Sequence, residues 1–185
     1  MAGNAAETVI AANGGVYVAT VGTSFPATVT TTPGAGWTDL GFITEAGVKV
    51  KPKLEVASFG AWQSAYKIRS VVTGRDITIG FTLRQWNEVN LVLALGGGAV
   101  SGSGPYTYTP PAIGAALIER AVLVRWQDGS KNYDLRILRA MPVDLAEFGL
   151  MRTGMADLGI TLELHDDGDD TTAPYTIVSD DTNWA

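Results

Sequence analysis

Residues 75–83, RDITIGFTL, alternate polar and apolar side chains from Asp76 onward. Successive side chains of a strand point to opposite faces of a sheet. The apolar members of this stretch therefore share one face: Ile77, Ile79, Phe81 and Leu83. We predict a strand with one buried side at this position.

Outward from this stretch, the same period of two predicts roughly nine or ten strands and an all-β domain. Pro52 has no N–H group to donate to a sheet ladder, so its strand is expected at an edge or at a bulge. Asp128 and Gly129 predict a type I′ turn and a hairpin over residues 120–140. The further expected strands cover residues 16–21, 37–43, 48–56, 65–73, 120–127, 132–140, 143–150, 157–164 and 175–178.

Residues 87–95 are the one segment with a helical pattern. Asn87 can cap the first turn, Glu88 suits that turn, and Gly96 can end the helix. Val89, Leu91, Val92 and Leu95 form a wide apolar stripe. We therefore expect one short helix that lies against the β domain.

The charges are few and unevenly placed. The chain has 185 residues, of which 17% are charged, and its formal net charge is −6. The acidic excess lies in the last part of the chain: Asp166, Asp167, Asp169, Asp170, Asp180 and Asp181. The remaining body is neutral and lacks the basic stripe that binds phosphates, so a sequence-specific nucleic-acid protein is not expected.

Other features exclude further classes of protein. The absence of cysteine excludes disulfides, thiolate metal sites and cysteine nucleophiles. Residues 1–12 lack a basic n-region, and no apolar run is long enough to cross a bilayer, so we expect a soluble protein made in a cytoplasm. We expect neither a cofactor nor an association with a membrane.

Three segments fit no strand well: residues 1–15, 22–36 and 165–185. The two terminal segments divide the chain into an amino-terminal arm (1–15), a β domain (16–165) and an acidic carboxyl-terminal arm (166–185). Within the domain, residues 22–36 form a long loop without any charge. Because this loop carries Phe25 and Val29, we infer that it becomes ordered against another surface. Val9 and Ile10 make the same case for the amino-terminal arm.

Few residues point to chemistry. His165 is the only histidine and is expected at a strand end, where it lacks the neighbours of a catalytic triad. Residues 166–170 hold four aspartates around Gly168, which leaves a cation site open beside a solvated acidic turn. A glycosidase could use pairs such as Asp144 with Glu147 or Asp157 with Glu163. Trp62, in an expected turn, could instead stack on a sugar and make a carbohydrate-binding β-sandwich.

The order of several short motifs resembles the major tail tube proteins of long non-contractile-tailed bacteriophages, particularly those of actinobacteria. These motifs are VYVA (16–19), WTDLG (37–41), EAGV (45–48), AWQ (61–63), FTL (81–83) with WN (86–87), and the segment from MPV (141–143) through RTGM (152–155) to LEL (162–164). The resemblance spans about residues 16–165.

This resemblance implies a β-sandwich or barrel with one flanking helix, similar to type VI secretion tube proteins. It also implies a virion protein whose copies form hexameric rings, and rings that stack into a tube through which DNA passes without specific binding. Expected partners are further copies, the tape measure protein, the tail terminator and distal tail or baseplate proteins. Assembly is expected in the host cytoplasm.

Roles for particular residues follow as expectations. Val9, Ile10, Phe25 and Val29 are expected at contacts between rings. Lys49, Lys51, Lys53 and Trp62 are expected at the interface within a ring, where an exposed ion pair contributes only ~0–1 kcal/mol. Asp134, Asp157 and Glu163 are candidates for the lumen, because like charge lets phosphates slide past.

Overall fold

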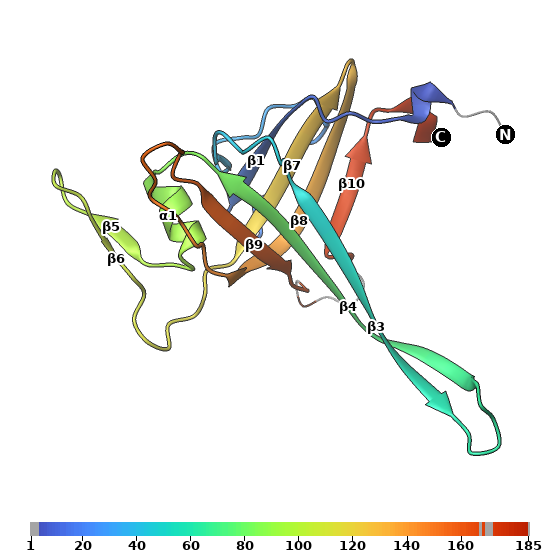
Figure 1. The fold of residues 1–185 in the computed structure, drawn as a ribbon. Coiled ribbons are helices and arrows are strands. Elements are labelled where there is room, and N and C mark those ends of the chain that lie inside the picture. The colour runs from blue at the N-terminus through green and yellow to red at the C-terminus, as the bar shows by residue number, and fades with distance from the viewer. Residues whose placement is uncertain (1–3, 167, 169–171, 185) are drawn as a thin grey trace.

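The computed structural model describes residues 4–166, 168 and 172–184. It is mostly β, with one short α-helix, α1 (Glu88–Ala94), and two 3₁₀ turns at Ala5–Glu7 and Thr182–Trp184 (Figure 1). The main sheet contains β1 (Asn13–Ala19), β2 (Thr38–Asp39), β3 (Lys49–Gly60), β4 (Lys67–Leu83), β7 (Arg120–Asp128), β8 (Lys131–Asp144), β9 (Leu158–Leu164) and β10 (Tyr175–Ser179). A separate two-stranded sheet pairs β5 (Ala99–Ser101) with β6 (Thr107–Thr109).

Seven strands of the main sheet pair antiparallel in the order β2-β1-β7-β8-β9-β4-β3, and the eighth strand, β10, pairs with β8 beside this path. β8 is the central strand, because β7 lies along one of its edges while β10 and β9 share the other. β10 pairs with the first part of β8, from Tyr133 to Ile137, and β9 pairs with its last part, from Ala140 to Asp144. The last strand of the chain thus extends the middle of the sheet rather than its end.

The core lies between the two halves of this sheet and α1. It combines Val16 and Val18 of β1 with the inward residues of the neighbouring strands and with Leu93 of the helix. The inward residues are Val122, Val124, Leu135, Ile137, Ile79, Phe81, Leu83, Leu158, Ile160 and Leu162. The apolar face predicted for residues 75–83 is therefore the core face of β4, apart from the more exposed Ile77.

A second, smaller apolar cluster covers the opposite face of β1 and β7. Ala121 and Leu123 alternate with the core residues of β7 and pack with Ala19 and Trp37. Phe25 joins this cluster, with its ring centroid 5.0 Å from that of Trp37, and the indole Nε1 of Trp37 donates to the carbonyl of Ser24 at 3.0 Å. Residues 22–36 therefore fold onto the sheet of their own chain.

The helix is confirmed, and its cap is the predicted one. The side-chain oxygen of Asn87 accepts a hydrogen bond from the backbone N–H of Asn90 at 2.9 Å. The side chain of Asn90 is fully buried and donates to the carbonyls of Leu40 and Gln85. These bonds fix α1 to the segment that precedes it and to the loop that follows β2.

Several predicted elements differ from the structure. Residues 65–73 and 75–83 belong to one long strand, β4, instead of two. In residues 37–43 only Thr38–Asp39 is a strand, and beyond Asp144 residues 145–150 form none. The hairpin of β7 and β8 is confirmed, but its turn is not type I′: of Gly129 and Ser130, only Gly129 has positive φ, as in a type II′ turn.

Candidate assembly surfaces

The hairpin of β3 and β4 projects beyond the rest of the molecule (Figure 1). β9 supports β4 only from Thr78 to Leu83, so the earlier residues of β4 pair with β3 alone. Isolated two-stranded hairpins are marginally stable in water. The projecting part of this hairpin therefore lacks support from its own chain.

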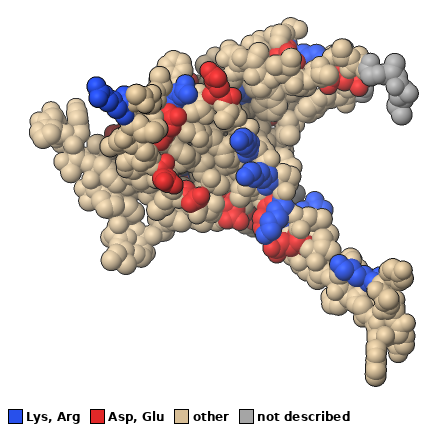
Figure 2. Space-filling model, in the orientation of Figure 1, with Lys and Arg blue, Asp and Glu red and all other residues tan. Residues whose placement is uncertain are grey.

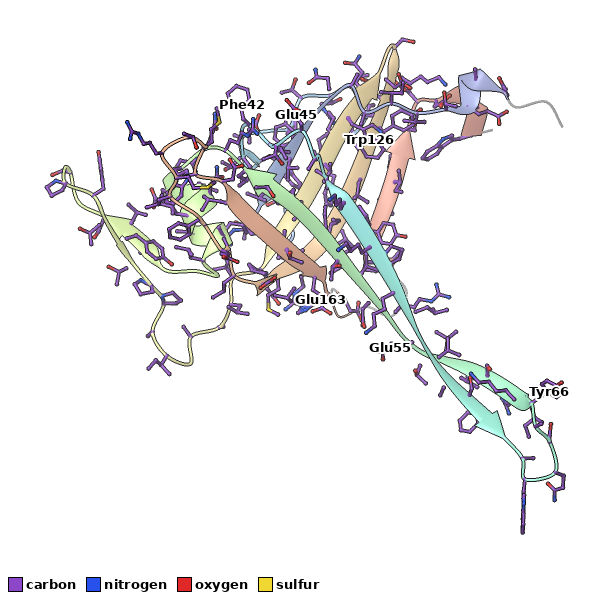
Figure 3. The ribbon with its side chains drawn as sticks, in the orientation of Figure 1. Phe42, Glu45, Glu55, Tyr66, Trp126 and Glu163 are labelled. Carbon is purple, nitrogen blue, oxygen red and sulfur yellow. The ribbon has the colours of Figure 1, made fainter. Side chains whose placement is uncertain are left out.

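Apolar side chains cover this projection. Trp62 is 100% exposed in the turn at its end, and Tyr66 beside it is 83% exposed (Figure 3). Six more large apolar residues of the hairpin are exposed: Leu54, Val56, Phe59, Ile68, Val71 and Val72. Exposed apolar side chains that gather on one segment in this way indicate an interaction site.

The lysines expected at the ring interface lie together on β3, an edge strand of the sheet. Lys53 donates to Glu55 at 3.0 Å and to Asp76 at 3.2 Å, and both hydrogen bonds raise its pKa. Lys49 and Lys51 form no ion pair with the described residues. They are the members of this group whose charge is available to a neighbouring molecule.

Glu163 shares the sheet face of these lysines. Lys51 is the cross-strand partner of Thr78, and Thr78 is that of Glu163, so the three residues form one row across β3, β4 and β9. The next row joins Lys49, Gly80 and Thr161. This face, which we call the polar face, lies opposite the core and carries small residues with a few charges of both signs.

The two other lumen candidates have different surroundings. Asp157 precedes β9 and is half-buried, with its Oδ1 3.7 Å from the Nε of Arg84. Asp134 is fully buried, and its carboxylate binds Arg125 and Arg136. The lumen interpretation of Asp134 is therefore corrected, because residues 22–36 cover its side of the sheet.

The candidates for contacts between rings divide in the same way. Val29 is only 5% exposed and Phe25 is half-buried against Trp37, so both side chains pack inside their own chain. Val9 and Ile10 are exposed. The backbone N–H of Ile10 donates to Asp128 at 3.0 Å, which places the amino-terminal arm beside the turn between β7 and β8.

The carboxyl-terminal segment is held at the same turn by contacts that the sequence did not indicate. Asp181 is almost completely buried and accepts a hydrogen bond from the hydroxyl of Tyr133 at 2.7 Å. Its carboxylate also lies 3.0 Å from the Nζ of Lys131. The ring of Tyr133 stacks on Trp126, with centroids 5.2 Å apart, and lies 5.8 Å from that of Trp184. We call residues 175–184 the terminal clasp.

The pKa shifts in the clasp follow from these hydrogen bonds. The hydroxyl of Tyr133 lowers the pKa of Asp181, and the bond together with burial raises the pKa of Tyr133 to about 12. The backbone and side-chain N–H groups of Asn132 lower the pKa of Asp180. Asp181 therefore binds Tyr133, and Asp180 binds Asn132, more strongly when the aspartate is ionised.

The groups considered for catalysis or metal binding are not assembled into such sites. His165 lies 3.8 Å from Glu119, which already binds Arg139 at 2.7 Å. Asp144 and Glu147 line a shallow depression of about 440 Å³ beside Lys49. Within residues 4–166, 168 and 172–184, no three metal-ligating side chains lie close enough together to hold a metal ion. Three residues of the possible cation site lie outside this described part: Asp167, Asp169 and Asp170. None of the described helices is long and apolar enough to span a membrane.

The projecting apolar hairpin, the polar sheet face and the docked arms define a structural β-protein with surfaces for association. The family model described as phage tail tube protein matches residues 1–185. The chain belongs to this family, so it is a structural, non-enzymatic component of the virion tail that assembles with tail proteins. A search of curated proteins finds no match. This match confirms the resemblance and the expected absence of enzymatic activity. It excludes the glycosidase alternative.

Proposed function

We propose that six copies of this chain close into a ring, and that rings stack into a hollow tube through which the phage genome passes into the host. The observation that carries this proposal is the β3–β4 hairpin, whose apolar side chains are exposed on a segment that its own chain does not support. Burial of each large apolar side chain contributes about 1.5–3 kcal/mol, so cover by a neighbouring copy is strongly favourable.

The edges of the sheet support closure into a ring. β3 ends the sheet on one side and β2 ends it on the other, and an exposed edge strand is a template for pairing with another chain. Joining the edge of one copy to a different edge of the next gives a heterologous contact, which closes when the rotation between copies permits. Lys49 and Lys51 on β3 would then meet carboxylates of the neighbour.

We propose that the polar face lines the lumen. Its small residues leave a smooth surface, and Glu163 contributes negative charge near the end of β9 (Figure 3). Six copies with a formal charge of −6 each give a ring with an overall excess of negative charge. Within the polar face, Lys51 shares its row with Glu163, and Lys53 binds Glu55 and Asp76, so the face offers no continuous basic stripe and DNA passes without being held. The tape measure protein, the tail terminator and distal tail proteins are the proposed partners inside and at the ends of the tube.

Electron microscopy of the purified protein tests the assembly. We expect rings and tubes at high protein concentration or with its partner proteins. A protein that stays monomeric under all of these conditions contradicts the proposal. Glu163→Cys tests the lumen, because the chain has no native cysteine. Reaction with a bulky polymer-linked maleimide should be fast in the monomer and blocked in the tube, whereas equal rates would place Glu163 outside.

Exposure of Trp62 at the hairpin end leaves carbohydrate binding as the alternative function. A glycan array decides between the two. We expect no binding by the wild-type protein, and glycan binding that is lost in Trp62→Ala would favour the alternative.

A further inference from the structure

Both ends of the chain are held at the turn between β7 and β8, and they lie at the same end of the molecule (Figure 1). The turn runs from Asp128 to Lys131, which are directly opposed cross-strand partners. Asp128 accepts the hydrogen bond from the backbone N–H of Ile10 in the amino-terminal arm. Lys131 binds Asp181 of the terminal clasp. Contacts from opposite ends of the sequence thus meet on neighbouring side chains.

The clasp also fixes the residue that follows the turn. The carboxylate of Asp180 accepts hydrogen bonds from the backbone N–H of Asn132 at 2.6 Å and from its side-chain amide at 2.8 Å. The carbonyl of Asn132 accepts hydrogen bonds from the hydroxyl of Ser179 at 3.0 Å and from the N–H of Asp180 at 3.3 Å. The clasp therefore holds the backbone of β8 where it leaves the turn.

The neighbouring strands of the sheet do not reach this turn. β1 pairs with β7 as far as Gln127, which lies opposite Asn13. β10 pairs with β8 from Tyr133 onward. A hairpin end without neighbouring strands is marginally stable in water. The amino-terminal arm and the clasp therefore supply support to the turn beyond the end of the sheet.

The charges of the two contacts lie close enough to act on one another. Lys131 lies 3.0 Å from the carboxylate of Asp181 and is the cross-strand neighbour of Asp128. The hydrogen bond to Asp181 and burial, together with the charges of Asp181 and Asp128, raise the pKa of Tyr133 to about 12. Acidic and basic side chains lie together at this end of the molecule (Figure 2).

We propose that the turn between β7 and β8 couples the two ends of the chain, so that release of the terminal clasp loosens the amino-terminal arm and release of the arm loosens the clasp. Two effects of the same sign contribute. Each segment orders the turn to which the other binds, so the second segment to dock loses less conformational entropy. Departure of Asp181 also lets the ammonium of Lys131 turn to Asp128, where it competes with the N–H of Ile10.

This coupling is a property of the single chain and does not depend on the proposed tube. Val9 and Ile10 are exposed on the amino-terminal arm. A partner that draws the clasp away therefore also releases these two apolar side chains, at the other end of the sequence. The reverse holds as well, because a coupling free energy is reciprocal.

Hydrogen exchange followed by mass spectrometry tests the coupling, at a protein concentration too low for assembly. Asp181→Ala opens the clasp without changing the arm, and it should raise the exchange rate of residues 9–12 by about fivefold. Ile10→Pro removes the N–H that Asp128 binds without changing the clasp. It should raise the exchange rate of residues 180–184 by the same factor, because the coupling is reciprocal.

Asn87→Ala is the matched control. It also removes a side chain that accepts a hydrogen bond from a backbone N–H, but at the start of α1. Loss of such a cap lowers the stability of the whole chain. The exchange rates of residues 9–12 and 180–184 should nevertheless stay as in the wild type.

The double variant of Asp181→Ala and Ile10→Pro gives a second readout. Its urea midpoint should shift by less than the sum of the two single shifts, because release of either end has already weakened the hold on the other.

An arm that exchanges as in the wild type while the clasp of Asp181→Ala exchanges faster would overturn the coupling. An effect in one direction only, or an equal effect in Asn87→Ala, would overturn it too. These outcomes are independent of tube formation, which electron microscopy tests separately.

Discussion

Arg125 of β7 and Asp134 of β8 are directly opposed cross-strand partners. They form a bidentate ion pair, with 2.7 Å between Nε and Oδ1 and 2.9 Å between Nη2 and Oδ2. The remaining nitrogen of Arg125, Nη1, donates to the carbonyl of Thr31 at 2.7 Å. One buried carboxylate thus orients the arginine that holds residues 22–36 on the sheet.

Asp134→Ala should lower the free energy of unfolding by about 3–5 kcal/mol, because it leaves Arg125 and Arg136 without their buried partner. Urea denaturation of the monomer measures this change. Asp76→Ala is the control, since Asp76 pairs with the exposed Lys53, and it should have little effect. Equal destabilisation by the two substitutions would contradict the role given to the buried pair.

The terminal clasp should open at both extremes of pH. The pKa of Asp181 lies below its ordinary value of 3.8, so its contribution is present above that pH and is lost as the pH falls further. The pKa of Tyr133 is raised from 10.0 to about 12, so its contribution is present below pH 10 and is lost as the pH rises toward 12.

Urea denaturation across the pH range, on wild type, Asp181→Asn and Tyr133→Phe, checks the clasp. Asp181→Asn should have a weaker acid dependence below pH 4, and Tyr133→Phe a weaker dependence above pH 10. Asp180, whose pKa is also lowered, should retain part of the acid dependence in the first variant. Unchanged pH profiles in both variants would show that the clasp does not couple to folding.

Val29→Ala should destabilise the monomer by about 1.5 kcal/mol, because the substitution removes two buried methyl groups at a site that is 5% exposed. The thermal unfolding of the monomer measures the effect. A variant with unchanged stability and failed assembly would instead return Val29 to the contact between rings that the sequence suggested.

Shortening the hairpin should separate folding from assembly. Leu54 and Arg75 are cross-strand partners, so residues 55–74 can be replaced by an Asn-Gly turn that closes β3 on β4 at that point. We expect a folded monomer with nearly unchanged thermal stability, because the removed segment makes no contribution to the core, and we expect no tubes in electron microscopy. Tubes of normal appearance would show that the projection is dispensable.

The elements that the sequence predicted well are those whose pattern is local. Residues 76–83 alternate without interruption, and α1 has its cap, stripe and terminating glycine within ten positions. The family resemblance relied on equally short motifs, and the match over the whole chain confirmed it.

The errors arise where a local pattern breaks or a distant segment intervenes. The alternation of β4 changes phase near Gly74, which suggested the end of a strand, but the structure has a bulge there, opposite Glu55 and Val56, and the strand continues. Asp134 lies between apolar neighbours on β8, so its side of the sheet was expected to face solvent. Only the return of residues 22–36, about a hundred positions away in sequence, buries it.

The assembly surfaces were only partly visible. Trp62 stood out in its turn, and the long run without charges at residues 89–118 was a signal that could have indicated the exposed segment around β5 and β6. The clasp had no such signal, because Asp181 and Tyr133 are 48 positions apart and neither motif is unusual alone.

β4 combines two kinds of residue within one strand of 17 residues, exposed in its first half and increasingly buried in its second. Substitutions from Lys67 to Thr73 therefore change the folding stability of a single chain very little, whereas those from Ile79 to Leu83 change it directly. Selection can thus act on the affinity between copies without a penalty in the yield of folded protein. A phage lineage can therefore change the affinity between the subunits of its tail through substitutions in the first half of β4, while the second half of the strand stays constant.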